Sequence, residues 1–508
     1  MRRTAFLLII LVLALGVLGP ETAQAQPSAA AASATWSSDI IYFNLTNILP
    51  DPITNKIVPK NLTVAFNGNG TSLAQSDTIS YQYYSNTILA GSIGKSFAGS
   101  AVVSADVPVV AVYKQVSSSS NPYSPILYTS FSADQAGNGT FYIPSVQRSP
   151  SFVSQIGIQN VEAVDLDLTL KFYPSGGGAP FIATQKSVKP QYSYVFKLSD
   201  LAVIPIPFYG SLVITATPSV GGSSNTDYIL AAVQEVQGNG RQAYAYEGAA
   251  NGASTIFMPS AMCNVGKTMQ TTYYAIQNID PNNAGIATIT YFDGQGKQIA
   301  QMTTDPIPPY NKNKNTISTC DPAVIKYTAG KTVLSAVITG TNLVAMGKVQ
   351  SNDGLMTAFL GSTQPTTNRK DANNNAEYHV ALPYVEWSNS TLGYRSYIAV
   401  MNASGQPETN IKVNYYRRNG KGQPFAVQTV QLASTNTPLQ INAKRNTEPD
   451  QVAGALDKSK AFLGAVEIIS DQPVVVIVRV QRGVSGIRGV TTLGDDYSGI
   501  NIPNDPNP

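Results

Sequence analysis

A short sequence pattern recurs at two distant places in this chain, and it restricts the folds that the chain can adopt. Residues 97–100 (FAGS) lead through a valine-rich run to Pro108, and residues 462–465 (FLGA) lead through a similar run to Pro473. In both copies the proline follows the glycine by nine residues. The pattern predicts two adjacent strands joined by a tight turn, with proline at the start of the second strand, where it removes no ladder hydrogen bond.

Two weaker copies lie between these. Residues 208–214 begin the second copy, which carries an inserted Gly/Ser loop at 221–224. Residues 335–345 form the third copy, which has lost the glycine and the proline. All four copies run into a glutamine, namely Gln115, Gln234, Gln350 and Gln481.

A second module recurs in three of the units. An asparagine stands 12 or 13 residues before a pair of aromatic residues, and a glycine-containing turn follows each pair, as expected for a hairpin. The asparagines are Asn160, Asn278 and Asn402, and the prolines that open these units are Pro144, Pro259 and Pro383. Units that repeat at 115 and 124 residues are long enough for the about seven short strands of a β-sandwich.

We therefore predict an all-β chain of tandem antiparallel β-sandwich domains that follow a cleaved signal peptide. Across residues 38–490 the chain resembles the Ig-like or fibronectin-III-like repeats of bacterial surface and matrix proteins. The predicted segments are a signal peptide (1–25), a flexible N-terminal segment (26–37), a divergent first sandwich (38–135), a second (140–250), a third with a disulfide (254–362), a fourth (378–490) and a polar C-terminal tail (491–508).

The N-terminus has the three parts of a secretory signal. Arg2 and Arg3 precede an apolar run over residues 5–18, and a small-x-small site predicts cleavage between Ala25 and Gln26. An apolar run of 14 residues is shorter than the about 20 that span a bilayer, which disfavours an uncleaved anchor. We expect a secreted protein of the extracellular cell surface, with no membrane insertion of the mature chain.

Composition excludes several functional classes. Charged residues make up 12% of the chain, against about 25% in an average globular protein. The formal charge of +3 becomes +3 − 2 + 1 = +2 once Arg2, Arg3 and Glu21 are removed with the signal, which argues against nucleic-acid partners. With one histidine and two cysteines, the chain has little material for metal sites or acid–base catalysis. We expect no catalytic residues, metal or cofactor.

Cys263 and Cys320 are the chain's only cysteines and lie 57 residues apart in the third unit. In an exported protein a disulfide is the natural interpretation, and in the chain-entropy model it contributes on the order of 4 kcal/mol. Two free buried thiols are the alternative.

Two motifs suggest chemistry but have simpler interpretations. Residues 261–268 match a relaxed phosphate-loop pattern, yet a strand-like run follows where a helix would be needed, so we interpret the segment as a turn. His379 has no nucleophile-elbow pattern beside it and is interpreted as a partly exposed strand residue.

Paired aspartates offer a weak hypothesis of calcium binding. Asp165 and Asp167 alternate with leucine, which predicts that both carboxylates face solvent from one strand. Asp495 and Asp496 are adjacent near the C-terminus. The chain also has 27 tyrosines, for which packing between strands is a sufficient explanation. N-x-Ser/Thr sequons begin at Asn44, Asn61, Asn69, Asn138, Asn389 and Asn402.

These observations together predict a non-enzymatic structural or adhesive protein that forms or decorates an extracellular layer, filament or matrix. Its expected partners are other copies of itself or other surface proteins, and segment 26–37 would add a strand to a neighbouring subunit. The alternative is a carbohydrate-binding attachment protein with polysaccharide as partner. An extracellular hydrolase is the third hypothesis.

Overall fold

The computed structural model shows a chain built almost entirely of antiparallel sheets. It describes residues 6–10, 36–44, 54, 56, 58–68, 71–79, 85–89, 99–117, 126–129, 137–220, 228–237, 242–322, 324–325, 334–365, 369–370, 376–390, 392–418, 426–452, 461–483 and 492–502. A short 3-10 helix, η3 (Leu198–Asp200), connects two strands. Within these ranges no helix has the length and apolar character needed to cross a bilayer. The predicted all-β class is confirmed.

The strands fall into four groups along the chain. Group 1 contains β1 (Phe6–Ile10), β2 (Trp36–Asn44), β3 (Lys60–Gly68), β4 (Thr71–Ile79), β5 (Ser85–Leu89), β6 (Ser100–Ala105), β7 (Val109–Ser117) and β8 (Ile126–Thr129). Group 2 contains β9 (Gly137–Asn138), β10 (Thr140–Arg148), β11 (Phe152–Asn160), β12 (Leu166–Pro174), β13 (Phe181–Val188), β14 (Ser193–Lys197), β15 (Phe208–Pro218), β16 (Tyr228–Gln237) and β17 (Ala243–Glu247).

Group 3 contains β18 (Ala253–Met258), β19 (Thr271–Asn278), β20 (Thr288–Asp293), β21 (Gln298–Thr303), β22 (Ile317–Ser318), β23 (Leu334–Gln350) and β24 (Met356–Leu360). Group 4 contains β25 (Arg369–Lys370), β26 (Ala376–Trp387), β27 (Tyr394–Asn402), β28 (Ile411–Arg417), β29 (Ala426–Ala433), β30 (Lys444–Thr447), β31 (Phe462–Ser470), β32 (Val474–Gly483), β33 (Thr492–Ser498) and β34 (Ile500–Asn501).

One pairing scheme recurs in all four groups. The first layer has the orders β4-β3-β6-β1, β13-β12-β15-β10, β21-β20-β23-β18 and β29-β28-β31-β26. The second layer has the orders β5-β2-β7-β8, β14-β11-β16-β17, β22-β19-β23-β24 and β30-β27-β32-β33. In group 3 the long strand β23 serves both layers. Each pair of layers encloses a cluster of buried apolar side chains, as in a β-sandwich.

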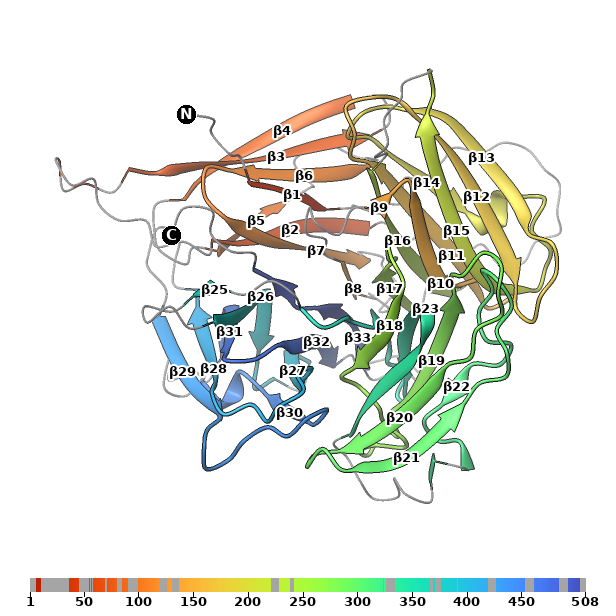
Figure 1. Ribbon diagram of the computed structural model, residues 1–508. Helices are drawn as coiled ribbons and strands as arrows, with labels where there is room; N and C mark the ends of the chain where they lie inside the picture. Colours follow the sequence, from red (N-terminus) through yellow and green to blue (C-terminus); the bar gives the residue numbers. More distant parts are fainter. Residues whose placement is uncertain are drawn as a thin grey trace.

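The four groups are arranged in a ring (Figure 1). Near its centre the edge strands of the second layers meet, and β8 contacts β17, β17 contacts β24, β24 contacts β33, and β33 contacts β8. We call β8, β17, β24 and β33 the axial strands. Group 4 thus packs against group 1, so the two ends of the described chain lie in neighbouring groups.

The repeat pattern translates into structure only in part. Asn160 pairs with Ile229, and Asn278 and Asn402 pair with the equivalent residues of their groups. The four glutamines, however, are not equivalent. Gln350 and Gln481 pair with residues seven positions before the group's asparagine, whereas Gln234 pairs five positions before it. Gln115 pairs six positions before Asn44, and a shift of one residue along a strand reverses the face, so the four glutamines do not share one structural position.

The segment predictions are only partly covered by the described residues. Strand β2 begins at Trp36, so the last two residues of the predicted flexible segment 26–37 belong to a sheet. Residues 26–35, the cleavage site at Ala25 and Gln26, the inserted loop at 221–224 and the last residues of the tail, 503–508, lie outside the described residues. The sandwich boundaries remain predictions.

Candidate functional site

A buried asparagine ends β11, β19 and β27, in groups 2, 3 and 4, and its side chain bonds two further segments of its group. Asn160 is fully buried, and its amide donates to the carbonyl oxygens of Val164 at 2.7 Å and Val188 at 2.8 Å, while its own oxygen accepts the N–H of Glu162 at 2.8 Å. Asn278 and Asn402 make the corresponding bonds in groups 3 and 4.

Asn44 ends β2 of group 1 in the same register, opposite Val109, and is also fully buried. It belongs to the repeat although the module with the aromatic pair does not mark it. Complete burial of Asn44 and Asn402 is incompatible with glycosylation of the folded chain at these two sequons.

A tight turn lies three residues beyond each fastened carbonyl. The N–H of Tyr192 donates to the carbonyl of Lys189 at 3.1 Å, and Gln191 at the third turn position has a φ of 65°. Proline at the second position and a positive φ at the third are typical of a type II turn. Group 3 repeats the turn with Tyr310 (φ 60°) and group 4 with Asn442 (φ 59°). We call these three the joint turns.

Each joint turn binds a serine of the preceding group. Ser100 of group 1 donates to the carbonyl of Gln191 at 2.9 Å, and Ser211 of group 2 donates to that of Tyr310 at 2.8 Å. Ser335 of group 3 donates to the carbonyl of Asn442 at 2.5 Å. All three serines are fully buried. The serine at the start of the recurring module therefore connects one group to the next.

Two joints have a second donor. The amide of Gln159 donates to the carbonyl of Gln191 at 3.3 Å, and that of Gln277 donates to Tyr310 at 3.0 Å. Both glutamines precede the buried asparagine of their group. In group 4 this position is Met401, which is buried in an apolar cluster with Phe257 of group 3.

The joint that closes the ring is apolar. Ala465 stands where the other groups have serine, and Phe43 stands where they have glutamine or methionine. Both are fully buried in one cluster with Tyr416, Ile500 and Ile502. The rings of Phe43 and Tyr416 lie 5.4 Å apart between centroids. The C-terminal strand β34 thus helps to join group 4 to group 1.

Asp495 is a central polar group of the ring axis. It lies on β33 and is fully buried, and its carboxylate accepts the backbone N–H of Ala245 on β17 at 2.8 Å and of Ala358 on β24 at 3.2 Å. One side chain therefore connects three groups. Burial, and then the charge of Asp496, raises the pKa of Asp495 well above its usual value.

Asp496 is paired with a cation. Arg479 of β32 binds both its oxygens at 2.8 Å, and Thr357 of β24 donates to it at 2.8 Å. These contacts account for the two aspartates without calcium, and the expectation of a calcium pair at this position has no support in the geometry.

Cations cross two of the other interfaces in an equivalent way. Lys348 of group 3 donates to the hydroxyl of Tyr244 in group 2 at 2.8 Å and lies 4.4 Å from the centre of its ring. Lys114 of group 1 makes the same contacts with Tyr384 of group 4, at 2.9 Å and 4.4 Å. Burial lowers the pKa of both lysines. Each tyrosine hydroxyl in turn donates to a carboxylate, Glu235 or Glu386.

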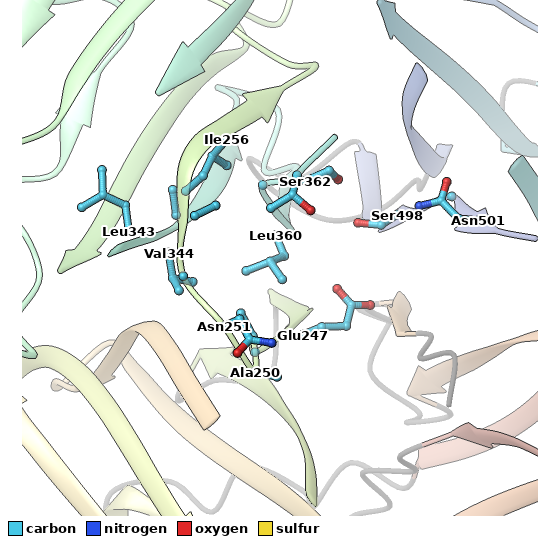
Figure 2. Close-up of a pocket in the computed structure, with 18 of the residues that line it drawn as sticks. Glu247, Ala250, Asn251, Ile256, Leu343, Val344, Leu360, Ser362, Ser498 and Asn501 are labelled. Carbon is cyan, nitrogen blue, oxygen red and sulfur yellow. The ribbon is translucent and has the colours of Figure 1, made fainter. Parts of the chain in front are cut away.

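A cavity of about 280 Å³ opens where three axial strands end (Figure 2). Glu247 ends β17, Leu360 ends β24 and Ser498 ends β33, and all three line it. Its remaining polar lining comes from separate segments, with Asn251 between groups 2 and 3, Ser362 and Thr363 after β24, and Asn501 on β34. Figure 2 shows these side chains around one space. The cavity carries hydrogen-bonding groups and one carboxylate.

A second cavity of about 280 Å³ lies between groups 3 and 4. Gln270 and Met262 line it from group 3, and Lys444 and Arg479 from group 4. Arg479 donates to Gln270 at 3.1 Å across the space. Burial lowers the pKa of Lys444 to about 7, and the charge of Arg479 adds to this effect.

The cysteines and the phosphate-loop segment agree with their sequence interpretation. Cys263 and Cys320 form a disulfide with their Cα atoms 4.9 Å apart. Residues 261–268 form a turn that leads into strand β19, and no helix follows.

The remaining candidates are held by neighbouring charges. His379 is half-buried on β26, and Glu467 lies 2.9 Å from its Nδ1. Asp165 pairs with Lys189 at 2.5 Å and Asp167 with Lys186 at 2.6 Å. Hydrogen bonds, first from Lys186, lower the pKa of Asp167 to about 2. Within the described ranges no three His, Cys, Asp or Glu side chains form a group able to hold a metal.

The joint turns carry a sequence signal that the repeat modules do not include. Pro190 precedes Gln191 and Pro309 precedes Tyr310, each about 30 residues after the buried asparagine of its group. That signal locates a turn, but it does not identify which serine binds it, because the partner lies in another group.

Comparisons with known proteins give no family for this chain. No family model and no curated protein matches it. One solved structure, the native conformation of E. coli alpha-2-macroglobulin, aligns over 90% of this chain and 28% of its own, with 7% identity and a TM-score of 0.11. A likeness this weak supports no inference about fold or function.

Proposed function

We propose that the chain is an exported, non-enzymatic structural or adhesive protein made of four tandem Ig-like β-sandwich domains. It acts as a rigid building block of an extracellular layer, filament or matrix, in contact with copies of itself or with other surface proteins. The observation that carries the proposal is the repeated joint, in which Ser100, Ser211 and Ser335 connect successive groups.

The polar groups of the interior support this assignment. Asp495, Asp496 and Arg479 are used in connecting groups 2, 3 and 4 through hydrogen bonds to one another and to backbone N–H groups. A catalytic site would need carboxylates or a histidine aimed at a substrate space. Asp495, Asp496 and Arg479 instead bond to one another and to neighbouring groups, which suits a protein whose role is mechanical.

The test is to purify the chain from the culture medium of its host, sequence its N-terminus and examine it by electron microscopy. We expect a chain that begins at Gln26 and forms ordered polymers or sheets, alone or on isolated cell surfaces. A protein found only in the cytoplasm, or one that stays monomeric and unattached under all conditions, contradicts the proposal.

A second candidate function is carbohydrate binding, and the axial cavity favours it. Glu247, Asn251, Ser362 and Asn501 offer the mixture of amide, hydroxyl and carboxylate groups that hydrogen-bond sugar hydroxyls. Binding to a glycan array that is lost in Asn251→Ala but kept in Ser199→Ala would support it. An array without hits would contradict carbohydrate binding and leave the structural role as the remaining proposal.

A further inference from the structure

The first strand of group 1 comes from the predicted signal peptide. Strand β1 pairs antiparallel with β6, with Ile10 opposite Ala101 and Leu8 opposite Val103. In groups 2, 3 and 4 the same position belongs to β10, β18 and β26, which lie within their own units. Group 1 is therefore completed by a segment that export is expected to remove.

The register of this pairing is that of the other groups. Ala101 comes two residues after the glycine of its module, as Leu212 and Val466 do in groups 2 and 4. Leu212 lies opposite Ile143, and Val466 lies opposite Leu382. Ile10 thus takes the place of Ile143 and Leu382 on the adjacent strand. The apolar stretch of the signal fills the first-strand position without a shift.

The connection of β1 to the rest of group 1 differs from that of the other first strands. Three residues separate β10 from β11, six separate β26 from β27 and twelve separate β18 from β19. Between β1 and β2 there are 36 − 10 − 1 = 25 residues, a span that contains the predicted cleavage site. Strand β1 behaves as an added segment rather than as part of a continuous hairpin.

The first-strand position requires apolar side chains at alternate residues. In group 2 Phe141 and Ile143 are fully buried, and in group 4 Val380 and Leu382 are 2% and 0% exposed. The mature N-terminus, residues 26–35 (QPSAAAASAT), has no apolar side chain larger than alanine apart from one proline. It therefore lacks the side chains that fill this position elsewhere.

We propose that β6 (Ser100–Ala105) is a strand-acceptor edge, occupied by Phe6–Ile10 in the precursor and by an extended segment of another polypeptide in the mature protein. The accepted segment carries branched or aromatic apolar residues at alternate positions and runs antiparallel to β6. Its main chain completes the ladder, and its side chains complete the core of group 1, which includes Val103 and Phe66. The inference rests on the proposed export, because cleavage vacates the edge.

The test uses the mature chain, residues 26–508, and a synthetic peptide of residues 4–12 with a solubilising lysine tail as the probe. Leu7 lies opposite Ser104, which is partly exposed. Directly opposite Cα atoms in an antiparallel pair lie within the range that a disulfide bridges. With oxidised glutathione as the oxidant, Ser104→Cys protein should therefore form a disulfide with the Leu7→Cys peptide about tenfold faster than with a Leu8→Cys peptide, because successive residues of a strand alternate between faces and Leu8 is paired with Val103.

Three controls separate the outcomes. A peptide with serine at positions 6, 8 and 10 should fail to bind, because it lacks the alternate apolar residues that the first strands of groups 2 and 4 bury. If cross-linking requires deletion of residues 26–35, the chain's own N-terminus occupies the edge and the proposal is wrong. Equal cross-linking rates for both cysteine peptides also contradict it. N-terminal sequencing is independent of these results: a chain that still begins at Met1 refutes the proposed export, whereas a chain from Gln26 that binds no peptide refutes only the acceptor edge.

Discussion

Replacement of Asp495 by alanine tests whether the ring axis holds the groups together. The carboxylate accepts the N–H of Ala245 and of Ala358, which belong to two other groups, and both residues are buried. Asp495→Ala leaves these two donors without their acceptor, in a space that becomes apolar. Each buried N–H that loses its acceptor destabilises the folded state by about 1–3 kcal/mol. For the two N–H groups together we expect the free energy of unfolding to fall by about 2–6 kcal/mol.

The measurement is urea unfolding of the mature chain at pH 7, followed by tryptophan fluorescence and by circular dichroism. Asp495→Asn keeps one acceptor oxygen but directs an amide N–H₂ at the other donor, so we expect a loss between those of the wild type and Asp495→Ala. Ser199→Ala, at an exposed residue of η3, is the control and should leave the midpoint unchanged. A fall of less than about 1 kcal/mol in Asp495→Ala would refute the idea that this side chain connects the groups.

Three further predictions concern the joints and the buried charges. Ser211→Ala should lower the free energy of unfolding, measured in urea, by about 0.5–1.5 kcal/mol, because the carbonyl of Tyr310 keeps only its bond from Gln277. An unchanged free energy would mean that the serine bond does not stabilise the folded chain. Lys444 has a pKa of about 7 in the folded chain and 10.5 in the unfolded one, so the unfolded state binds more protons between pH 7 and 10.5. The free energy of unfolding should therefore rise with pH across that window. Lys444→Met should raise the melting temperature at pH 7 and abolish the rise with pH. The pKa of Glu408 is raised from 4.5 to about 9, first by burial and then by Asp471, so the folded state binds more protons than the unfolded one in this range. The free energy of unfolding should therefore fall from pH 4.5 to 9. Glu408→Gln should remove this fall, and a variant with the wild-type pH profile would contradict the shift.

The all-β class was predictable because it depends on local patterns. Alternating apolar residues and Asp-Gly or Asp-x-Pro turns specify strands without reference to the rest of the chain. The recurring Asn160, Asn278 and Asn402 were also visible as a repeat. The sequence did not show what they bind, because one of the two carbonyls that each asparagine bonds lies 28, 29 or 37 residues further along the chain.

The contacts between groups were beyond sequence reasoning for a physical reason. Ser211 and Tyr310 are 99 residues apart, and Asp495 and Ala245 are 250 apart, so no local pattern joins them. Asp495 and Asp496 suggested a calcium pair, and nothing in the local sequence predicted their burial, since carboxylates are rarely buried unless paired. Their burial became favourable only because Arg479 and three backbone N–H groups from separate strands converge on them.

The apolar contact between groups 4 and 1 has a consequence for the stability of the ring. Open arrays of repeats need special terminal units, because their first and last members expose a face meant for a neighbour. Here Phe43 of the first group and Ala465 of the last cover each other, so each terminal unit serves as the other's cap. A break at any single joint leaves the parted groups tethered through the other three, at an effective concentration that favours closing again. Such a ring resists stepwise fraying from its ends, a property that an open chain of the same four units lacks.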